Sequence, residues 1–334
     1  MWDKSNSKEK QERRAYKKLL AGSSYYGCGR YLKSRSEIER QEIYTHFEFE
    51  RLSDKYKDII DFYHGEAHEN WNQTLFSYFF KYVGDKRNKE AYMTLAKRVG
   101  YNAILRERLD PLRVEALLLG ASGLLKDYND DLYTLSIKRE AEYLMRKYEI
   151  TPLSSRAWKI QKQYPHNHPV LRLAQAATLF TKHELFLDKI LECRCLEDIE
   201  EIFMVDASDY WTTHYVPSKV SSSEVKRLGG MKCNILGINL VVMIQFAYGS
   251  YTMNDDMVDR AQNLIQDLKA ESNKYINCWR DYGIRPKTAF EGQALIQISE
   301  KYCSEARCRE CYIGARAIKD MSWIEDDDDE DDGE

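Results

Sequence analysis

Apolar side chains recur at three- and four-residue steps along most of this chain, with charged residues between them. The pattern is clear over residues 37–82, and four strongly apolar stretches follow, which begin near residues 112, 170, 235 and 292. Such spacing places the apolar side chains on one face of an α-helix, and stretches that are apolar on nearly every face indicate central helices. The pattern therefore predicts an all-α fold, arranged as a single multi-helical domain.

Asp110-Pro111 marks the start of the first of these central helices, with Asp as the N-cap and Pro in the first turn. Glu115 lies inside this helix among apolar residues. A buried carboxylate without a partner would cost several kcal/mol. We therefore expect Glu115 to form an ion pair that joins helices, with a partner among Arg113, Arg139 and Arg172.

Breaks between the helices are few. Gly (16) and Pro (6) are scarce, which favours long helices over hairpins. An amphipathic helix is expected over residues 130–149, and Thr151-Pro152 is expected to start another. The two longest breaks are a proline-bounded loop at residues 158–169 and a Ser-, Thr- and Gly-rich segment at residues 206–230. A loop as long as the second tends to be functional or mobile.

Charge sets the two ends of the chain apart from the rest. Residues 1–36 hold ten Lys and Arg against three acids. Residues 323–334 hold nine acids and no base, so the net charge of the chain, −4, becomes +5 when residues 323–334 are left out. We expect a flexible basic arm over residues 1–36, a helical domain over 37–320 and a disordered acidic tail over 321–334. Either both ends are simply solvated, or the arm meets nucleic acid while the tail competes for it.

Two features of the sequence bear on the cellular location of the protein. The N-terminal residues lack the apolar core of a signal peptide, and the most apolar stretch, residues 235–248, is shorter than a membrane span. We expect a buried core helix there. Eight cysteines without an export signal indicate reduced thiols. These features predict a cytoplasmic protein with no membrane partner, and they leave the oligomeric state open.

Three cysteines near the end of the chain form a C-x4-C-x2-C array, Cys303, Cys308 and Cys311. C-x2-C aims two thiolates at one metal, and the third cysteine gives a spacing like that of iron–sulfur loops. The fourth ligand is unknown: an exogenous group, a histidine, Cys278 or Cys28 would complete the set, as would Cys193 or Cys195. The alternatives are a zinc ion, an iron–sulfur cluster, reduced structural thiols and a redox switch.

The segment YWTTHY, residues 210–215, carries the other candidate chemistry. His214 is suited to proton transfer near neutral pH, which makes it a candidate catalytic residue. Tyr210 and Trp211 could stack a nucleic-acid base, and Lys226 and Arg227 follow closely in the sequence to meet phosphates. The alternative is that the aromatic residues fix this loop to the helices while His214 bonds a backbone carbonyl.

Two further polar patterns are expected to be structural. Asp209 precedes Glu224-Val225-Lys226 in the manner of a D…E-x-K nuclease site, but without the apolar alternation of a buried strand. His166 and His168 form an H-x-H pair without further ligands close by in sequence. We expect both features to make loop hydrogen bonds.

Six phrases together resemble one family: WNQTLFSYFFKYVG, LRVEALLLGASGLL, PHNHPVLRLAQAATLF, YWTTHY, LGINLVVMIQFAYG and AFEGQALIQISEKYCSEARCRECYIG. In this order they resemble the C-terminal helical region of the bacterial domain-of-unknown-function family 2851 (DUF2851), over roughly residues 50–316, and the last phrase is the most specific. Longer members carry a segment resembling a PD-(D/E)XK nuclease ahead of this region. We expect this chain to begin after that segment, so the resemblance implies no nuclease centre here.

The resemblance instead implies the helical partner of a nuclease-like module. We therefore expect a non-catalytic module associated with nucleic acid, whose partners are nucleic acid or a nuclease-like protein. One alternative is a protein-interaction scaffold that pairs with a separate nuclease-like chain. A second alternative is a hydrolase that uses His214.

Overall fold

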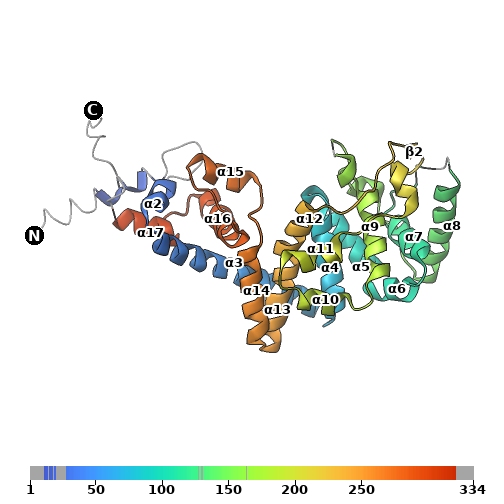
Figure 1. Cartoon of the computed structure of the whole chain (residues 1–334), viewed down its shortest axis with the longest axis horizontal. Coiled ribbons are helices and arrows are strands. Elements are labelled where there is room, and N and C mark those ends of the chain that lie inside the picture. The colour runs from blue at the N-terminus through green and yellow to red at the C-terminus, as the bar shows by residue number, and fades with distance from the viewer. Residues whose placement is uncertain are drawn as a thin grey trace, which may run out of the picture. The chain divides into compact units, whose positions relative to one another are not determined.

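Helices make up nearly all the regular structure in the computed structural model of this chain (Figure 1). The structure describes residues 11–13, 15–17, 19, 28–126, 128, 131–162 and 164–320. Strands in this part of the chain are limited to one two-stranded hairpin, so the all-α prediction is confirmed. The predicted basic arm is described only in part, and the predicted acidic tail lies outside the described residues.

The chain divides into two compact units. Unit 1 comprises residues 1–55 and 269–334, and unit 2 comprises residues 56–268. One boundary falls inside α3 (Glu37–Gly65), a helix of 29 residues. The sequence pattern predicts one domain over residues 37–320 and does not anticipate this division, because the helical period runs through residue 55 without a break.

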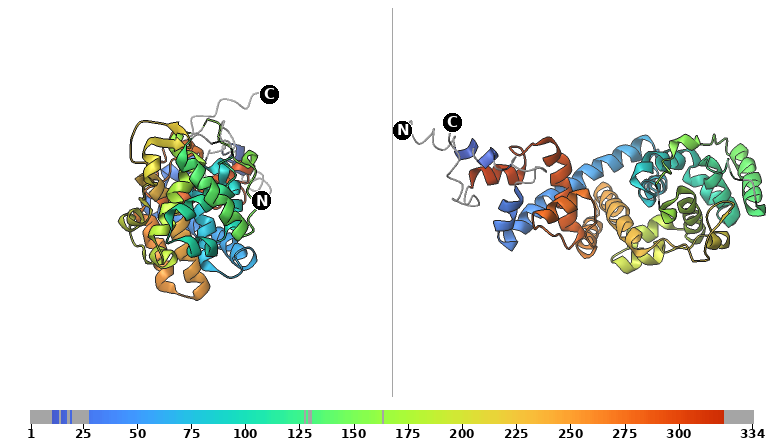
Figure 2. Two further views of the ribbon diagram at one scale, coloured as in Figure 1. Left: turned by 90° about the vertical axis from the view of Figure 1, so that its right-hand side faces the viewer. Right: turned by 90° about the horizontal axis from the view of Figure 1, so that it is seen from above.

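Unit 1 contains the first part of α3 together with α2 (Cys28–Ser34), α15 (Lys274–Asp281), α16 (Ala289–Lys301), the 3₁₀ turn η6 (Cys303–Glu305) and α17 (Tyr312–Lys319). Buried hydrogen bonds join them: Trp279 Nε1 of α15 donates to Ser299 Oγ of α16 at 2.9 Å. Helices α2 and α17 lie side by side, although one precedes and the other follows most of the chain (Figures 1 and 2).

Unit 2 contains the rest of α3 and most of the other elements. Its first half has α4 (Trp71–Val83), η1 (Lys86–Asn88), α5 (Lys89–Val99), α6 (Tyr101–Glu107), α7 (Pro111–Ala121), α8 (Leu132–Lys147), η2 (Ser155–Ala157), η3 (Pro165–Asn167) and α9 (Pro169–Lys182). Its second half has α10 (Phe186–Glu192), α11 (Leu196–Phe203), η4 (Asp209–Thr213), β1 (His214–Val216), β2 (Lys219–Val220), α12 (Gly230–Leu236), the π-helical segment η5 (Gly237–Val241), α13 (Val242–Thr252) and α14 (Asp255–Asp267). The central helix α7 packs against α8, α9 and α5.

Aromatic side chains fill the core of unit 2. Phe76, Phe79 and Phe80 of α4 are fully buried and contact Phe180 of α9 with ring centroids 5.0 to 6.0 Å apart. Phe203 of α11 stacks on Phe79. Edge-to-face and offset rings of this kind add to the free energy gained from burying their area. The aromatic stripe of the sequence is thus core packing.

One predicted helix start is confirmed and another is wrong. Asp110 Oδ1 accepts hydrogen bonds from the backbone N–H groups of Leu112 and Arg113 at 3.1 and 3.3 Å, as an N-cap does. No helix begins at Thr151-Pro152, where the described backbone is irregular and holds the turns η2 and η3. The backbone N–H of Leu153 donates to the carbonyl of Ala121 at 2.8 Å, which ties this segment to the end of α7.

The most apolar stretch of the sequence belongs to a helical run longer than the pattern predicts. Elements α12, η5 and α13 are continuous over Gly230–Thr252, which is 23 residues. By length and composition alone this run could cross a membrane. Within unit 2, 67% of its most apolar window is buried, and it packs against α14, α4 and α11. This burial is that of a core helix.

Candidate functional site

Residues 206–227 form a closed loop on unit 2 around the hairpin β1–β2. Asp206 pairs with Arg227 at the base of the loop, and Ser221 N donates to Thr213 O at 2.7 Å. His214 lies opposite Val220 in an irregular antiparallel register. The long polar stretch of the sequence is therefore an ordered loop with its own hydrogen bonds.

Glu115 fixes this loop to the central helix. Trp211 Nε1 donates to Glu115 Oε1 at 2.5 Å, Ser208 Oγ donates to Oε2 at 3.0 Å, and the Tyr133 hydroxyl also donates to Oε1. Burial raises the pKa of Glu115, and these three hydrogen bonds oppose the rise. The expected arginine partner is thus replaced by neutral donors, because residues 206–211 fold back over α7.

Tyr210 lies between two other rings. Its ring stacks on Tyr133 at 3.8 Å and on His214 at 4.1 Å between centroids. Its hydroxyl donates to Asp131 Oδ2 at 2.9 Å. A base needs a free aromatic face for stacking, and both faces of Tyr210 are covered.

His214 makes the contacts of a structural histidine. Its Nδ1 lies 3.0 Å from the carbonyl oxygen of Tyr210 and 3.0 Å from Thr213 Oγ1. In the tautomer whose Nδ1–H donates to this carbonyl, Nδ1 has no lone pair left to accept from the Thr213 hydroxyl. This geometry does not form a nucleophile–base pair.

The other three residues predicted to bind nucleic acid are also engaged inside unit 2. Trp211 is fully buried, and Lys226 is 2% exposed, with its Nζ 2.8 Å from the carbonyl of Thr212 and 4.3 Å from the ring centroid of Tyr215. Burial lowers the pKa of Lys226. Arg227 donates to both carboxylate oxygens of Asp206, at 2.6 and 3.0 Å. In this conformation none of the four residues offers both a free surface and an unpaired charge or ring to nucleic acid.

The two histidines of the H-x-H pair take separate roles. His168 is the N-cap of α9, where its Nδ1 accepts from the backbone N–H of Val170, and burial lowers its pKa to about 4. His166 Nε2 is exposed, 3.0 Å from the Tyr215 hydroxyl, which also bonds Glu224. Within the described ranges, no three His, Cys, Asp or Glu side chains are arranged to hold a metal ion. The E-x-K segment is therefore polar loop structure.

The cysteine array lies in unit 1, and Cys28 interacts with it. Cys303 lies in η6 and Cys311 is the N-cap residue of α17, with Cys308 between them. Cys28, the first residue of α2, hydrogen-bonds Cys303, and this bond raises the pKa of Cys28, as do burial and electrostatic interaction with all three cysteines of the array. The sequence offers Cys28 among several candidates for a fourth ligand, and that assignment stays a prediction, because among the described residues no three His, Cys, Asp or Glu side chains are arranged to hold a metal ion.

The remaining cysteines are not among the groups that shift the pKa of Cys28. Cys278 lies half-buried on α15 in unit 1, and Cys193, Cys195 and Cys233 belong to unit 2. Cys193 Sγ donates to the carbonyl of Lys189 at 3.3 Å, as a structural thiol does.

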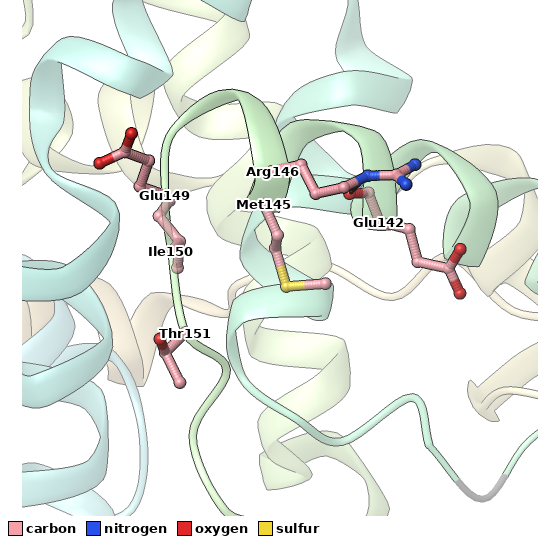
Figure 3. A pocket seen from close by; sticks show the side chains of 6 residues that line it. All are labelled: Glu142, Met145, Arg146, Glu149, Ile150 and Thr151. Carbon is pink, nitrogen blue, oxygen red and sulfur yellow. Dashed lines mark hydrogen bonds between the residues drawn. The ribbon is translucent and has the colours of Figure 1, made fainter.

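Surface hollows in the two units differ in their charge. In unit 1, a hollow of about 430 Å³ beside α17 is bordered by three basic residues and one acid, with the lining Glu12, Arg13, Arg309, Ala315, Ile318 and Lys319. In unit 2, a hollow of about 570 Å³ at the end of α8 contains Glu142, Arg146 and Glu149 (Figure 3). The two carboxylates there point away from each other, so they form no acid–base pair.

Comparison with known families identifies the chain. Residues 5–274 match the family described as protein of unknown function (DUF2851). The chain belongs to the DUF2851 family. The DUF2851 match begins earlier than the resemblance over residues 50–316 indicates, and it ends before the cysteine array, so the phrase considered most specific lies outside it. Searches among curated proteins and among solved structures gave no match.

Proposed function

We propose that this DUF2851 chain is a non-catalytic module that associates with nucleic acid, and that the basic surface of unit 1 meets the phosphates. The observation that carries the proposal is the hollow beside α17, bordered by Arg13, Arg309 and Lys319. All three residues are exposed, and the Arg309 guanidinium lies 4.8 Å from the ring centroid of Tyr16. Arginine and lysine side chains around a concave surface attract a phosphate backbone.

The net charges of the two units also favour unit 1 as the part that meets nucleic acid. Outside residues 323–334, unit 1 has 23 Lys and Arg against 16 Asp and Glu, a net charge of +7. Unit 2 has 27 Lys and Arg against 29 Asp and Glu, a net charge of −2. Affinity for nucleic acid comes largely from phosphate contacts, so the positive unit is the better candidate.

The test is DNA binding measured by fluorescence anisotropy at stepped salt concentrations. We expect the wild-type chain to bind labelled duplex or single-stranded DNA at about 50 mM salt, and to lose affinity steeply as salt rises. The triple variant Arg13→Ala, Arg309→Ala and Lys319→Ala should reduce the salt slope by about 2 to 3, since each phosphate contact contributes about one unit.

A matched control removes the same number of charges from unit 2. Lys57, Lys126 and Arg156 are exposed there, and their triple alanine variant should bind like the wild type. The proposal is wrong if the wild type does not bind at low salt, or if the two triple variants lose affinity equally.

A further inference from the structure

Unit 2 has a second group of aromatic side chains, and this group reaches the surface. We call it the aromatic surface cluster, and its members are Tyr63, His64, Trp71, Tyr248 and Tyr251. Tyr63 stacks on Trp71 with 4.5 Å between ring centroids, and Tyr251 meets these two rings edge to face at 5.2 and 5.9 Å. The members come from the end of α3, the first residue of α4 and the C-terminal part of α13, so tertiary packing brings them together.

Part of this cluster is exposed. Tyr63 is buried, whereas Trp71 and Tyr248 are half-buried and Tyr251 is 38% exposed. Met253, at the turn between α13 and α14, is 90% exposed (Figure 1). Tryptophan, tyrosine and methionine are enriched at protein interfaces, and the first two are common hot-spot residues. Because the rings hold one another in place, little side-chain entropy is lost when a partner covers them.

Acidic residues lie next to the cluster in the sequence and in the fold. The two turns beside it, residues 65–70 and 252–256, contain no lysine or arginine and four acids, Glu66, Glu69, Asp255 and Asp256. Glu66 is paired with Lys97 at 3.1 Å, and Glu69 Oε1 lies 3.3 Å from Nδ1 of His64, a member of the cluster. The two aspartates are exposed in the first turn of α14. The exposed rings therefore have a negatively charged border.

This combination favours a cationic partner. The faces of tyrosine and tryptophan rings carry partial negative charge and attract guanidinium and ammonium groups. An arginine side chain can stack on a ring and pair with a neighbouring carboxylate at the same time. The net charge of unit 2, −2, adds to this preference.

We propose that the aromatic surface cluster and Met253 form a docking surface for a partner protein, which binds through a segment rich in arginine and containing apolar side chains. The apolar side chains of that segment cover Tyr251 and Met253, and its guanidinium groups pair with the carboxylates of the two turns. This inference concerns unit 2 and does not depend on nucleic-acid binding by unit 1.

The first test uses a labelled octapeptide of alternating arginine and leucine, whose binding to the full chain is measured by fluorescence anisotropy at about 150 mM salt. We expect it to bind about tenfold more tightly than the same peptide with glutamine in place of arginine. Equal affinities would overturn the basic character of the partner. Absence of binding by the arginine peptide would overturn the docking surface.

The second test locates the binding. Tyr251→Ser should weaken binding of the arginine peptide about tenfold, because it removes a ring at the centre of the cluster. Tyr164→Ser is the matched control, since Tyr164 is an 80% exposed tyrosine of the same unit outside the cluster, and it should bind like the wild type. Equal affinity of the two variants would overturn the proposal. If Tyr251→Ser does not fold, as judged by circular dichroism, Met253→Ser at the 90% exposed position replaces it, with an expected loss of about threefold.

The third test addresses the charges. Glu69→Gln should weaken binding about threefold, whereas Glu149→Gln, at an exposed glutamate of unit 2 with a similar positive φ, should not change it. Residues 323–334 hold nine acids and attract any basic peptide. A chain without them should still prefer the arginine peptide to the glutamine peptide, and a preference that vanishes with these residues would overturn the proposal.

Sedimentation of the full chain separates a partner protein from a second copy of this chain. We expect the wild type and Tyr251→Ser to have the same oligomeric state. An oligomer that dissociates in Tyr251→Ser would assign the cluster to contact between copies and would overturn the basic partner.

Discussion

The two units of this chain share a helical architecture but differ in net charge. Outside residues 323–334, unit 1 carries +7 and unit 2 carries −2. In unit 2, the acid that the sequence singles out, Glu115, receives three hydrogen bonds, and Lys226 donates to a carbonyl. Among the described residues, both units also hold buried polar atoms without a hydrogen-bond partner, such as Glu48 Oε1 in unit 1 and Gln245 Oε1 in unit 2. The difference in charge therefore makes unit 1 the better candidate for an anionic partner.

The largest expected effect is on the stability of unit 2. Glu115→Ala leaves the buried Trp211 indole and the Tyr133 hydroxyl without an acceptor and opens a cavity, which should cost about 3 to 5 kcal/mol in the free energy of unfolding. Urea unfolding measures it. Glu142→Ala, on the exposed face of α8, should stay within about 0.5 kcal/mol of the wild type. A small loss at Glu115 would contradict its anchoring role.

Glu48 in unit 1 should behave differently from Glu115, because no hydrogen bond to its Oε1 opposes burial, which raises its pKa from 4.5 to about 7. The native state therefore binds the proton more tightly than the unfolded state. Its contribution to stability is present below about pH 4.5 and is lost as the pH rises through about 7, by up to about 3 kcal/mol.

Glu48→Gln keeps the shape of the protonated acid and removes this loss. The variant should be more stable than the wild type at pH 8, by up to about 3 kcal/mol, and by less than about 1 kcal/mol at pH 5. Glu37→Gln, an exposed change on the same helix, should change stability by less than about 0.5 kcal/mol at both pH values. Urea unfolding at the two pH values is the measurement, and a Glu48→Gln effect of equal size at both would contradict the prediction.

The turn that carries Cys308 and Cys311 should be sensitive to a single methyl group. A Cβ at Gly314 would lie 2.0 Å from the carbonyl oxygen of Cys308, so Gly314→Ala must displace this turn. We expect a loss of about 1 to 3 kcal/mol in the free energy of unfolding, measured in urea. Gly229→Ala, where a Cβ meets nothing within 4 Å, is the control and should leave the free energy of unfolding unchanged.

The smallest effect concerns the acidic segment. Deleting residues 323–334 removes nine negative charges from the end of unit 1. If these charges compete with nucleic acid, DNA affinity at low salt should rise about tenfold, and the gain should vanish at high salt because the interaction is screened. Fluorescence anisotropy of labelled DNA measures this affinity at both salt concentrations. An unchanged affinity at low salt would contradict the competition.

The sequence predicts the helices well and the sites less well. The three- and four-residue period and the Asp110 cap depend on local chemistry, so they can be read directly. Lys226 follows a polar run and looks exposed in the sequence, but the hairpin folds Tyr215 and Thr212 around it. The partners of Glu115 likewise come from a distant loop.

The cysteines of unit 1 show the same limit. The C-x4-C-x2-C spacing identifies Cys303, Cys308 and Cys311 from local sequence. The interaction of Cys28 with them depends on long-range packing, in which α2 lies against α17, and no local pattern encodes it. Whether these cysteines bind a metal stays a prediction.

The central claim is that nucleic acid binds to unit 1 of this chain. Hydrogen exchange of the full chain with and without a DNA oligonucleotide tests it most directly, because the change in amide protection is measured segment by segment. The account predicts slower exchange over residues 308–319 and 11–17 when DNA is bound, with residues 209–227 unchanged. Protection confined to residues 209–227 would contradict it.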